Sequence, residues 1–515
     1  MTKYDASSRW GQLDGARTGI LNRCERYAEH TLPKICPPTG YDQNSQELSH
    51  EWQAVGAQSV NHLANKMMLA LFAPSRPFFR YQANAELAAE LEGLGVDAGA
   101  LAEALSKGER DAVQALDGMA ARPKLYEALK HLIITGNVML ILGKEGIRIV
   151  GIKRYVCKRN VEGKVVEMML REELLFDELA PKVQEYLIQI GIHKPERDKA
   201  SKVCLYKWVR WDSKSGDYLM TQHVDATPLP AEFGGKWPAD KLPYRCLTWD
   251  LADESDYGTG LVEDYAGDFS ALSTLSRAQI ESAILSSEFR WLVNPGGMTK
   301  PEDLQNSENG AALPGMKDDI SLVQAGKVGE LQVIQNIAGD YIQRIGRGFL
   351  LGSAVTRDAE RVTAEEIRLQ AQELETSLGG GYSRLAVDFQ KPMAFWLTDM
   401  IGLSLKGNKI KPVVITGLDA LSRNGDIEAL KLYLSDLAAV TQLPPMLQNM
   451  LRLRSIATKL AAGRGIASSE VLLTDEEIAQ NNQAAQAAQQ EQMNAQAAAD
   501  AGGQIAVNQS GAPQQ

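Results

Sequence analysis

The sequence of 515 residues contains no apolar run long enough to cross a membrane. Its longest strongly apolar stretch, residues 132–142, is interrupted by Thr-Gly-Asn, whereas a spanning helix needs about 20 apolar residues. The polar first residues include no apolar segment of the kind that a signal peptide requires. We therefore expect no membrane partner and no cleaved secretion signal.

Cysteine is sparse and scattered. No two of the five cysteines have the C-x-x-C spacing that is common in zinc sites. An odd, dispersed set is typical of a chain that lives in a reducing cytosol rather than one held together by disulfides. The sequence therefore predicts no metal site and no disulfide framework.

The familiar catalytic motifs are also missing. There is no G-x-x-x-x-G-K-[ST] phosphate loop, because Gly143-Lys144 and Gly326-Lys327 lack both the upstream glycine and a following Ser or Thr. Neither G-x-S-x-G nor H-E-x-x-H occurs, and the six histidines fall in different segments. We expect no catalytic residues, no cofactor and no enzymatic activity.

Basic residues are fewer than acidic residues, with 54 Lys and Arg against 65 Asp and Glu. The formal net charge is −11, which argues against tight nonspecific DNA binding through phosphate neutralisation. From Gly465 onward there are acids but no Lys or Arg, so the rest of the chain is closer to neutral. An ordinary acidic surface is the simplest interpretation.

One acid-rich stretch, residues 250–268, raises an alternative. Its carboxylates could surround two metal ions, as in a metal-dependent nuclease. The side chains concerned are Asp253, Glu254, Asp256, Glu263, Asp264 and Asp268. However, Glu263 and Asp264 stand in the first turn of an expected helix, where acids favour the helix dipole. The structural interpretation is preferred, and the nuclease remains the alternative.

What the sequence does contain is typical of an α+β fold that is mainly helical. Residues 52–74 place Val60, Leu63, Ala64, Met67 and Leu71 on one helical face, with Ser49 as a candidate cap. Three hairpins are predicted at residues 138–150, 155–170 and 203–224, each around a Gly-containing turn. Residues 243–260 are expected to form a loop.

Two long helices follow, with a small module between them. The first carries an apolar stripe from Leu261 to Leu292, and the second lies at residues 331–351. The packing face of the second helix contains Leu331, Ile334, Ala338, Tyr341, Ile345 and Phe349. We expect an antiparallel pair, in which Ile334, Tyr341, Ile345 and Phe349 face the first helix of the same or a neighbouring subunit.

Beyond the pair, residues 352–361 lack periodicity and predict a loop. Thr363-Ala-Glu-Glu366 forms a capping box for the next helix, and Pro392 should kink a later one. The Ala/Gln-rich segment after residue 479 is expected to be a flexible tail.

Several of these runs, in the same order, resemble the portal (head-to-tail connector) proteins of short-tailed, T-odd-type bacteriophages. The runs are residues 52–74, 127–140, 292–299, 354–368, 373–385, 415–426 and 472–477. None is a catalytic motif, so their number and order carry the resemblance. It fades at about residues 84–120 and 177–205.

The resemblance implies a portal fold with a β-containing wing, a two-helix stem, a small clip and a helical crown. The implied divisions are a wing at 1–260, stem helices at 261–291 and 329–350, a clip at 292–328, a tunnel loop at 351–361, wing and crown helices at 362–410, a crown at 411–478 and a tail at 479–515. On this basis Gly352, Ser353, Arg357 and Arg361 would face DNA in the channel, whereas the residues alone predict an ordinary surface loop.

The resemblance further implies a ring, expected to have twelve subunits, at one vertex of the virion capsid and assembled in the host cytoplasm. Double-stranded DNA would pass through it without sequence specificity, during packaging and ejection. Implied partners are a terminase motor, tail adaptor proteins, scaffold and the major capsid protein. A helical scaffold without a pore is a further alternative.

Overall fold

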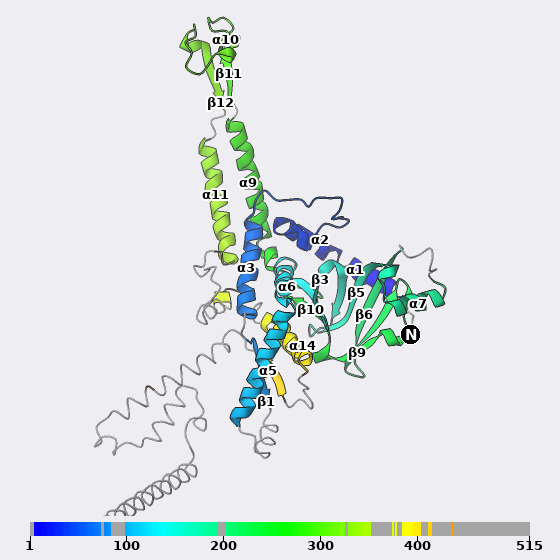
Figure 1. The fold of residues 1–515 in the computed structure, drawn as a ribbon. Coiled ribbons are helices and arrows are strands. Elements are labelled where there is room, and N and C mark those ends of the chain that lie inside the picture. The colour runs from blue at the N-terminus through cyan, green and yellow to red at the C-terminus, as the bar shows by residue number, and fades with distance from the viewer. Residues whose placement is uncertain are drawn as a thin grey trace, which may run out of the picture. The chain divides into compact units, whose positions relative to one another are not determined.

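The computed structural model divides the chain into two compact units, Met1–Gly417 and Leu418–Gln515. The structure describes residues 5–73, 77–83, 98–192, 201–287, 289–324, 328–351, 373–374, 376–378, 384–402, 410–414 and 435. All of these except residue 435 belong to the first unit. Figure 1 draws the described helices and strands in colour by residue number. The predicted capping box at Thr363–Glu366 and the Ala/Gln tail lie outside the described residues.

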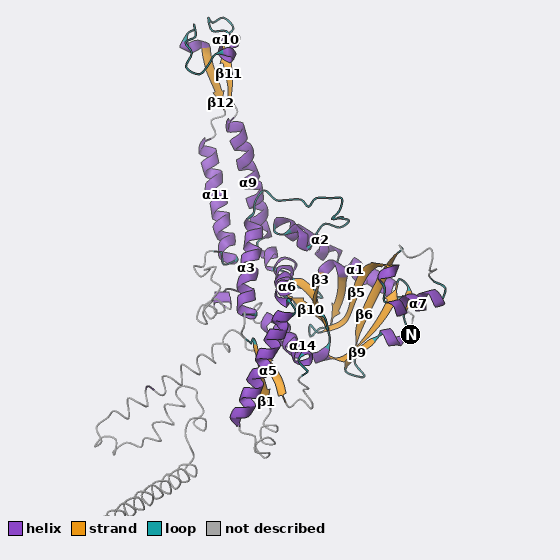
Figure 2. Ribbon diagram, viewed as in Figure 1, coloured by secondary structure: helices purple, strands orange, loops and turns teal. Residues whose placement is uncertain are grey.

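Helices and strands are mixed in this unit, as Figure 2 shows, so the expected α+β class is confirmed. The helices are α1 (Ala6–Ala16), α2 (Thr18–His30), α3 (Val55–Leu71), α5 (Ala98–Gly118), α6 (Ala121–Thr135), α7 (Pro181–Gln189), α8 (Leu261–Asp264), α9 (Ala266–Ser287), α10 (Pro301–Asn306), α11 (Val328–Gly348) and α14 (Lys391–Met400). None of the described helices is long and apolar enough to cross a bilayer.

The strands form four antiparallel sheets in the described part of the chain. The larger sheet contains β4 (Tyr155–Arg159), β5 (Val165–Leu175), β6 (Lys202–Asp212), β7 (Asp217–Val224), β8 (Thr227–Pro228) and β9 (Gly235–Pro238). A three-stranded sheet has the order β10 (Tyr244–Thr248), β2 (Asn137–Gly143), β3 (Gly146–Gly151). The remaining pairs are β1 (Phe79–Ala83) with β13 (Ile410–Val414), and β11 (Phe289–Val293) with β12 (Ile320–Gln324).

All three predicted hairpins are present, as β2–β3, β4–β5 and β6–β7. Their turns contain Gly146, Gly163 and Gly216, whose positive φ angles suit glycine. Two details differ from expectation. The first hairpin belongs to a different sheet from the other two, and the expected loop at 243–260 begins with strand β10, which pairs with β2.

Helix α3 has the expected apolar stripe. Its five predicted side chains are all at most 1% exposed. Ser49, however, does not cap the helix. Helix α3 begins at Val55, and the Ser49 hydroxyl instead donates to the Glu29 carboxylate at 2.8 Å. The predicted start was therefore wrong, because a distant carboxylate binds the hydroxyl.

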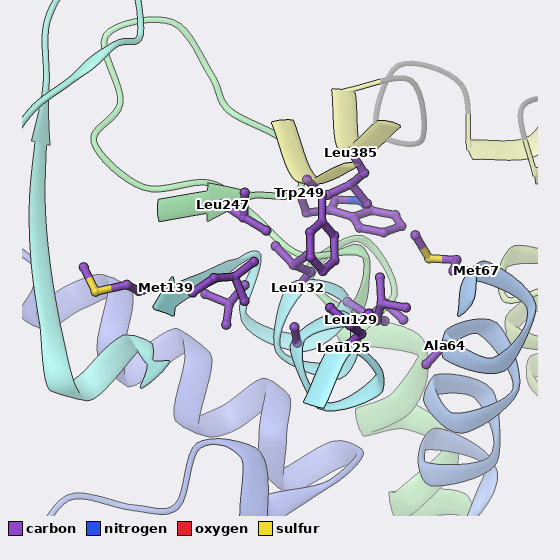
Figure 3. Close-up of a cluster of buried hydrophobic side chains, with 14 of the residues drawn as sticks. Ala64, Met67, Leu125, Leu129, Leu132, Met139, Leu247, Trp249 and Leu385 are labelled. Atoms are coloured by element: carbon purple, nitrogen blue, oxygen red, sulfur yellow. The ribbon is translucent and has the colours of Figure 1, made fainter. Parts of the chain in front are cut away.

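The core is centred on α6. Leu125, Leu129 and Leu132 from this helix are fully buried. Figure 3 shows them among side chains from α3, β2 and β10, with Trp249 close by. Segments that are more than 100 residues apart in the sequence, such as Met67 and Leu247, thus share one apolar cluster. Burial of this kind is the main favourable contribution to folding.

Helices α9 and α11 run side by side, and the β11–β12 module continues from their far ends (Figure 1). The helical stripe that was predicted through Leu292 stops earlier, at Ser287. Residues Phe289–Val293 are instead strand β11, since they pair with residues 320–324 from the other side of the module. The β-prone sequence Phe-Arg-Trp-Leu-Val suits a strand once that partner is present.

Within this module, the Asp319 carboxylate holds two turns together. Its Oδ2 accepts from the backbone N–H groups of Met298 (3.0 Å), Thr299 (3.3 Å) and Met316 (3.3 Å). The N–H of Met316, followed by those of Thr299 and Met298, lowers the pKa of Asp319. The carboxylate therefore stays ionised and satisfies donors that the short strands leave open.

At the predicted kink, a π-helical turn at Ala386–Gln390 leads directly into α14. Pro392 stands in the first turn of α14 and cannot donate to the preceding turn, because it has no N–H. The wider π turn accommodates that missing bond. The irregularity is therefore found where Pro392 predicts it.

Buried His131 makes stability depend on pH. Burial lowers its pKa from 6.5 to about 4, so the folded protein keeps this ring neutral. Between those values the unfolded chain binds more protons, and stability falls as pH is lowered. Between about pH 7.5 and about pH 4.5, the unfolding free energy of the wild type should therefore fall. We expect this fall to be about 2–4 kcal/mol smaller in His131→Leu.

Urea unfolding of both proteins at the two pH values measures this difference. His50→Leu is the control, because His50 is exposed. An equal pH dependence in wild type and His131→Leu would contradict the assignment.

Candidate functional site: helices α9 and α11

The predicted packing face of α11 meets α9 within one chain. Ile345 and Phe349 are fully buried, and Ile334 and Tyr341 are partly buried. The Phe349 ring lies 5.4 Å from that of Tyr265 and 5.7 Å from that of Phe269, both in edge-on geometry. Such pairs add about 0.5–1.5 kcal/mol beyond area burial. The part of these four residues in subunit assembly stays a prediction.

Close approach at the base of the pair depends on one glycine. A Cβ at Gly348 would lie 2.3 Å from the Tyr265 ring, well inside van der Waals contact. Nearby, Arg344 pairs with Asp268 across the two helices at 3.1 Å. The base of the pair is therefore tightly packed and the two helices are joined by charge at its edge.

Farther along, both helices expose apolar side chains. On α9, Ile280, Ile284 and Leu285 are 42%, 56% and 51% exposed. On α11, Val333 and Ile337 are 56% and 42% exposed. We call these five residues the outer apolar face. Several exposed large apolar side chains on neighbouring helices often mark an interaction site.

Helix α11 ends in a strained turn. Leu350 has φ of +58°, in the left-handed region where a side chain costs about 1–2 kcal/mol. The Leu351 N–H donates to the Gly346 carbonyl at 2.7 Å and closes the helix end. The turn directs the chain into residues 352–361.

Two side chains from α3 bind the carbonyl of this strained residue. His62 Nε2 donates to the Leu350 carbonyl at 3.0 Å, and Lys66 Nζ donates to it at 3.2 Å. Lys66 is only 1% exposed, and its ammonium also pairs with the Glu373 carboxylate at 3.1 Å. One buried cation therefore contacts residues on both sides of segment 352–372. We call Lys66, His62, Leu350 and Glu373 the Lys66 cluster.

Charge within the cluster favours a neutral imidazole. Desolvation, and then the nearby Lys66 ammonium, lower the pKa of His62. A neutral ring with its proton on Nε2 can donate to the carbonyl, whereas protonation would place two cations side by side. At neutral pH the Leu350 carbonyl thus accepts from one cationic and one neutral donor.

The predicted channel residues themselves, Gly352, Ser353, Arg357 and Arg361, lie outside the described residues. The Lys66 cluster was not predicted from the sequence. A signal was available, because His62 and Lys66 are four residues apart and so share a helical face. Nothing local identifies their acceptor, which is nearly 300 residues away.

The acid-rich stretch has structural partners instead of a shared metal site. Glu263 pairs with Arg23 at 2.9 Å, Asp268 pairs with Arg344, and the Asp256 carboxylate accepts from the Arg159 backbone N–H at 2.6 Å. Among the residues that the structure describes, no group of three His, Cys, Asp or Glu side chains could hold a metal ion. Nothing in this geometry favours the nuclease alternative.

Substitution of Lys66 should loosen the end of α11. In Lys66→Met the Leu350 carbonyl loses its charged donor and Glu373 loses its partner. The free energy of global unfolding can stay unchanged when an apolar residue replaces a buried charge. We therefore expect the loss of protection to be confined to the end of α11. We expect amide hydrogens at residues 346–351 to exchange about tenfold faster or more. Hydrogen-exchange mass spectrometry tests this, with exposed Lys124→Met as control. Unchanged protection would show that Lys66 does not hold the turn.

The comparisons with known proteins agree with the ordered sequence resemblance. Residues 3–472 match the family described as Bacteriophage head to tail connecting protein. The portal protein of Enterobacteria phage SP6 is 32% identical over 487 residues, which cover 94% of this chain and 93% of the relative. That of Escherichia phage T7 is 32% identical over 490 residues, covering 92% and 89%.

A chain from the neck of an empty GTA particle aligns with a TM-score of 0.38 and 11% identity, over 80% of this chain and 90% of that one. The assignment itself comes from the family match and from relatives at 32% identity. The chain belongs to the bacteriophage head-to-tail connecting protein family.

Proposed function

We propose that this chain is the portal subunit of a phage particle, and that copies of it close into a ring around a DNA channel at one capsid vertex. The observation that carries the proposal is the outer apolar face of α9 and α11. It lies outside the contact that the two helices make with each other, so another surface is needed to cover it. A neighbouring copy offers that surface.

Ring closure follows from how such a face can be satisfied. A heterologous contact repeated by rotation either closes into a ring or grows without limit. In a closed ring, a neighbouring subunit covers the outer apolar face of every subunit. An open assembly would leave this face exposed on its terminal subunit. We expect twelve subunits because of the resemblance to the portal family. The relatives from phages SP6 and T7 are themselves portal proteins.

The role in such a particle is structural and mechanical. DNA would move through the ring during packaging and ejection, driven inward by a separate terminase motor. Tail adaptor proteins would dock afterwards, and scaffold and major capsid protein would surround the ring during assembly. A net charge of −11 suits a channel, because few phosphate contacts let DNA slide instead of gripping it.

In this proposal, α9 and α11 form the stem and the β11–β12 module forms the clip that docks partners. Residues 1–260 form most of the wing, and residues 411–478 form the crown. Residues 351–361 act as the tunnel loop, with Arg357 and Arg361 near DNA. The Lys66 cluster supports this role, because it holds residues at both ends of the loop-containing segment in one place.

Charged substitutions on the outer apolar face should prevent ring assembly but leave the single subunit folded. Val333→Glu with Ile337→Glu places two carboxylates where a neighbour would desolvate them. Because both positions are exposed within one chain, each should change subunit stability by only about 0.5 kcal/mol. We expect folded monomers in native mass spectrometry. Gln332→Glu, an exposed site on the same helix, is the control. Normal rings from the double variant would remove the basis of the proposed interface.

Arginine in the proposed tunnel loop should affect DNA and leave assembly intact. Arg357→Ala removes a cation that would touch phosphates weakly. We expect intact rings but reduced packaging or retention of DNA. Each phosphate contact that is lost removes the favourable release of about one counterion from the DNA, which weakens binding. Genome content of purified particles is the measurement, with Arg361→Ala as a second test. Wild-type DNA content in both variants would indicate an ordinary surface loop.

A further inference from the structure

A cleft of about 360 Å³ lies where the β10 strand, the 160–164 turn and the start of α14 meet. Four cationic side chains line it: Arg159, Lys164, Arg245 and Lys391. Two acids, Asp240 and Asp388, also line it. The cleft therefore carries an excess of positive charge in a chain whose net charge is strongly negative.

Arg159 holds the backbone around the cleft. Its guanidinium donates to the carbonyls of Asp256 (3.2 Å), Gly163 (2.8 Å) and Cys246 (3.2 Å). These bonds use three of its five N–H groups and fix the walls of the cleft. The other three cations have more N–H groups left for a ligand among the described residues.

Those three retain donor capacity within the part of the chain that the structure describes. Arg245 donates one guanidinium N–H to the Asp240 carbonyl at 2.7 Å, but its buried Nε has no protein partner. Lys164 lies 3.1 Å above the centre of the Trp211 ring. Among the described residues, no carboxylate forms an ion pair with Lys164 or Lys391. A buried donor without an acceptor is costly, so a bound acceptor would stabilise it.

Asp388 does not supply that acceptor. Burial raises its pKa, although Arg384, Arg159, Arg245 and Lys391 act in the opposite direction. Its carboxylate thus experiences the same cations without a hydrogen bond to any of them among the described residues. Asp388 lines the same cleft as Arg159, Arg245 and Lys391.

We propose that this cleft binds a phosphate-type oxyanion, with Arg245 Nε, Lys164 and Lys391 as its donors. Several cationic donors around a site that is partly shielded from water are the usual recognition of such groups. The volume exceeds that of phosphate alone, so the phosphate group of a larger molecule such as a nucleoside monophosphate would also fit.

Titration of the purified full-length protein with inorganic phosphate, at constant ionic strength and with chloride as the reference, tests the proposal. We expect a saturable rise in the thermal unfolding midpoint, because a ligand that binds only the folded state stabilises it. Arg245→Met and Lys391→Met should each weaken binding by about tenfold or more. Lys391 is exposed, so its variant should fold normally even if Arg245→Met does not.

Two further variants distinguish recognition from general charge. Asp388→Asn should tighten phosphate binding, because it removes a repelling carboxylate. Lys182→Met, at an exposed position on α7, should leave binding unchanged. A nucleoside 5′-monophosphate that binds more tightly than phosphate would identify a nucleotide as the source, and equal affinity would identify free phosphate. No saturable effect in wild type, or equal binding by Lys391→Met and wild type, would overturn the proposal.

Discussion

The last turns of helix α6 must be enclosed on every side, and the rest of the first unit is arranged to do this. Every residue from His131 to Thr135 is buried, so the last part of this helix has no solvent face. Helices α2, α3 and α8 and strands β2 and β3 contact it. Because α8 leads into α9, and α3 holds the end of α11, the cover over α6 also positions the helix pair.

Long polar side chains from distant segments repeatedly bind carbonyls where regular structure begins or ends. Gln390 donates to the Leu71 carbonyl and Arg122 to that of Phe72, both at 2.5 Å, where α3 terminates. Arg17 donates to the carbonyls of Ile152 and Tyr155, where β4 begins. Lys66 does the same for α11. Helix ends leave carbonyls without partners, and in this chain long polar side chains satisfy them and join the elements.

Local periodicity predicted much of this fold. The stripe of α3 and the three hairpins depend on neighbouring residues, which sequence patterns record directly. The stop of α9 at Ser287 was missed because strand β11 exists only by pairing with residues 320–324. The Lys66 cluster was missed for the same reason, since its donor and acceptor belong to distant segments. Of the candidate site, the apolar face of α11 was predictable, and the contacts that fix its end were not.

The pairing of β1 with β13 gives the chain a late folding step. Strand β1 ends at Ala83, and its only strand partner among the described residues begins at Ile410. At about 5–20 residues per second, a ribosome needs roughly 16–65 s to synthesise the intervening segment. The edge of β1 therefore stays open until most of the polypeptide has been made. A chain in which this pair has formed has already synthesised its first 414 residues, helices α9 and α11 among them.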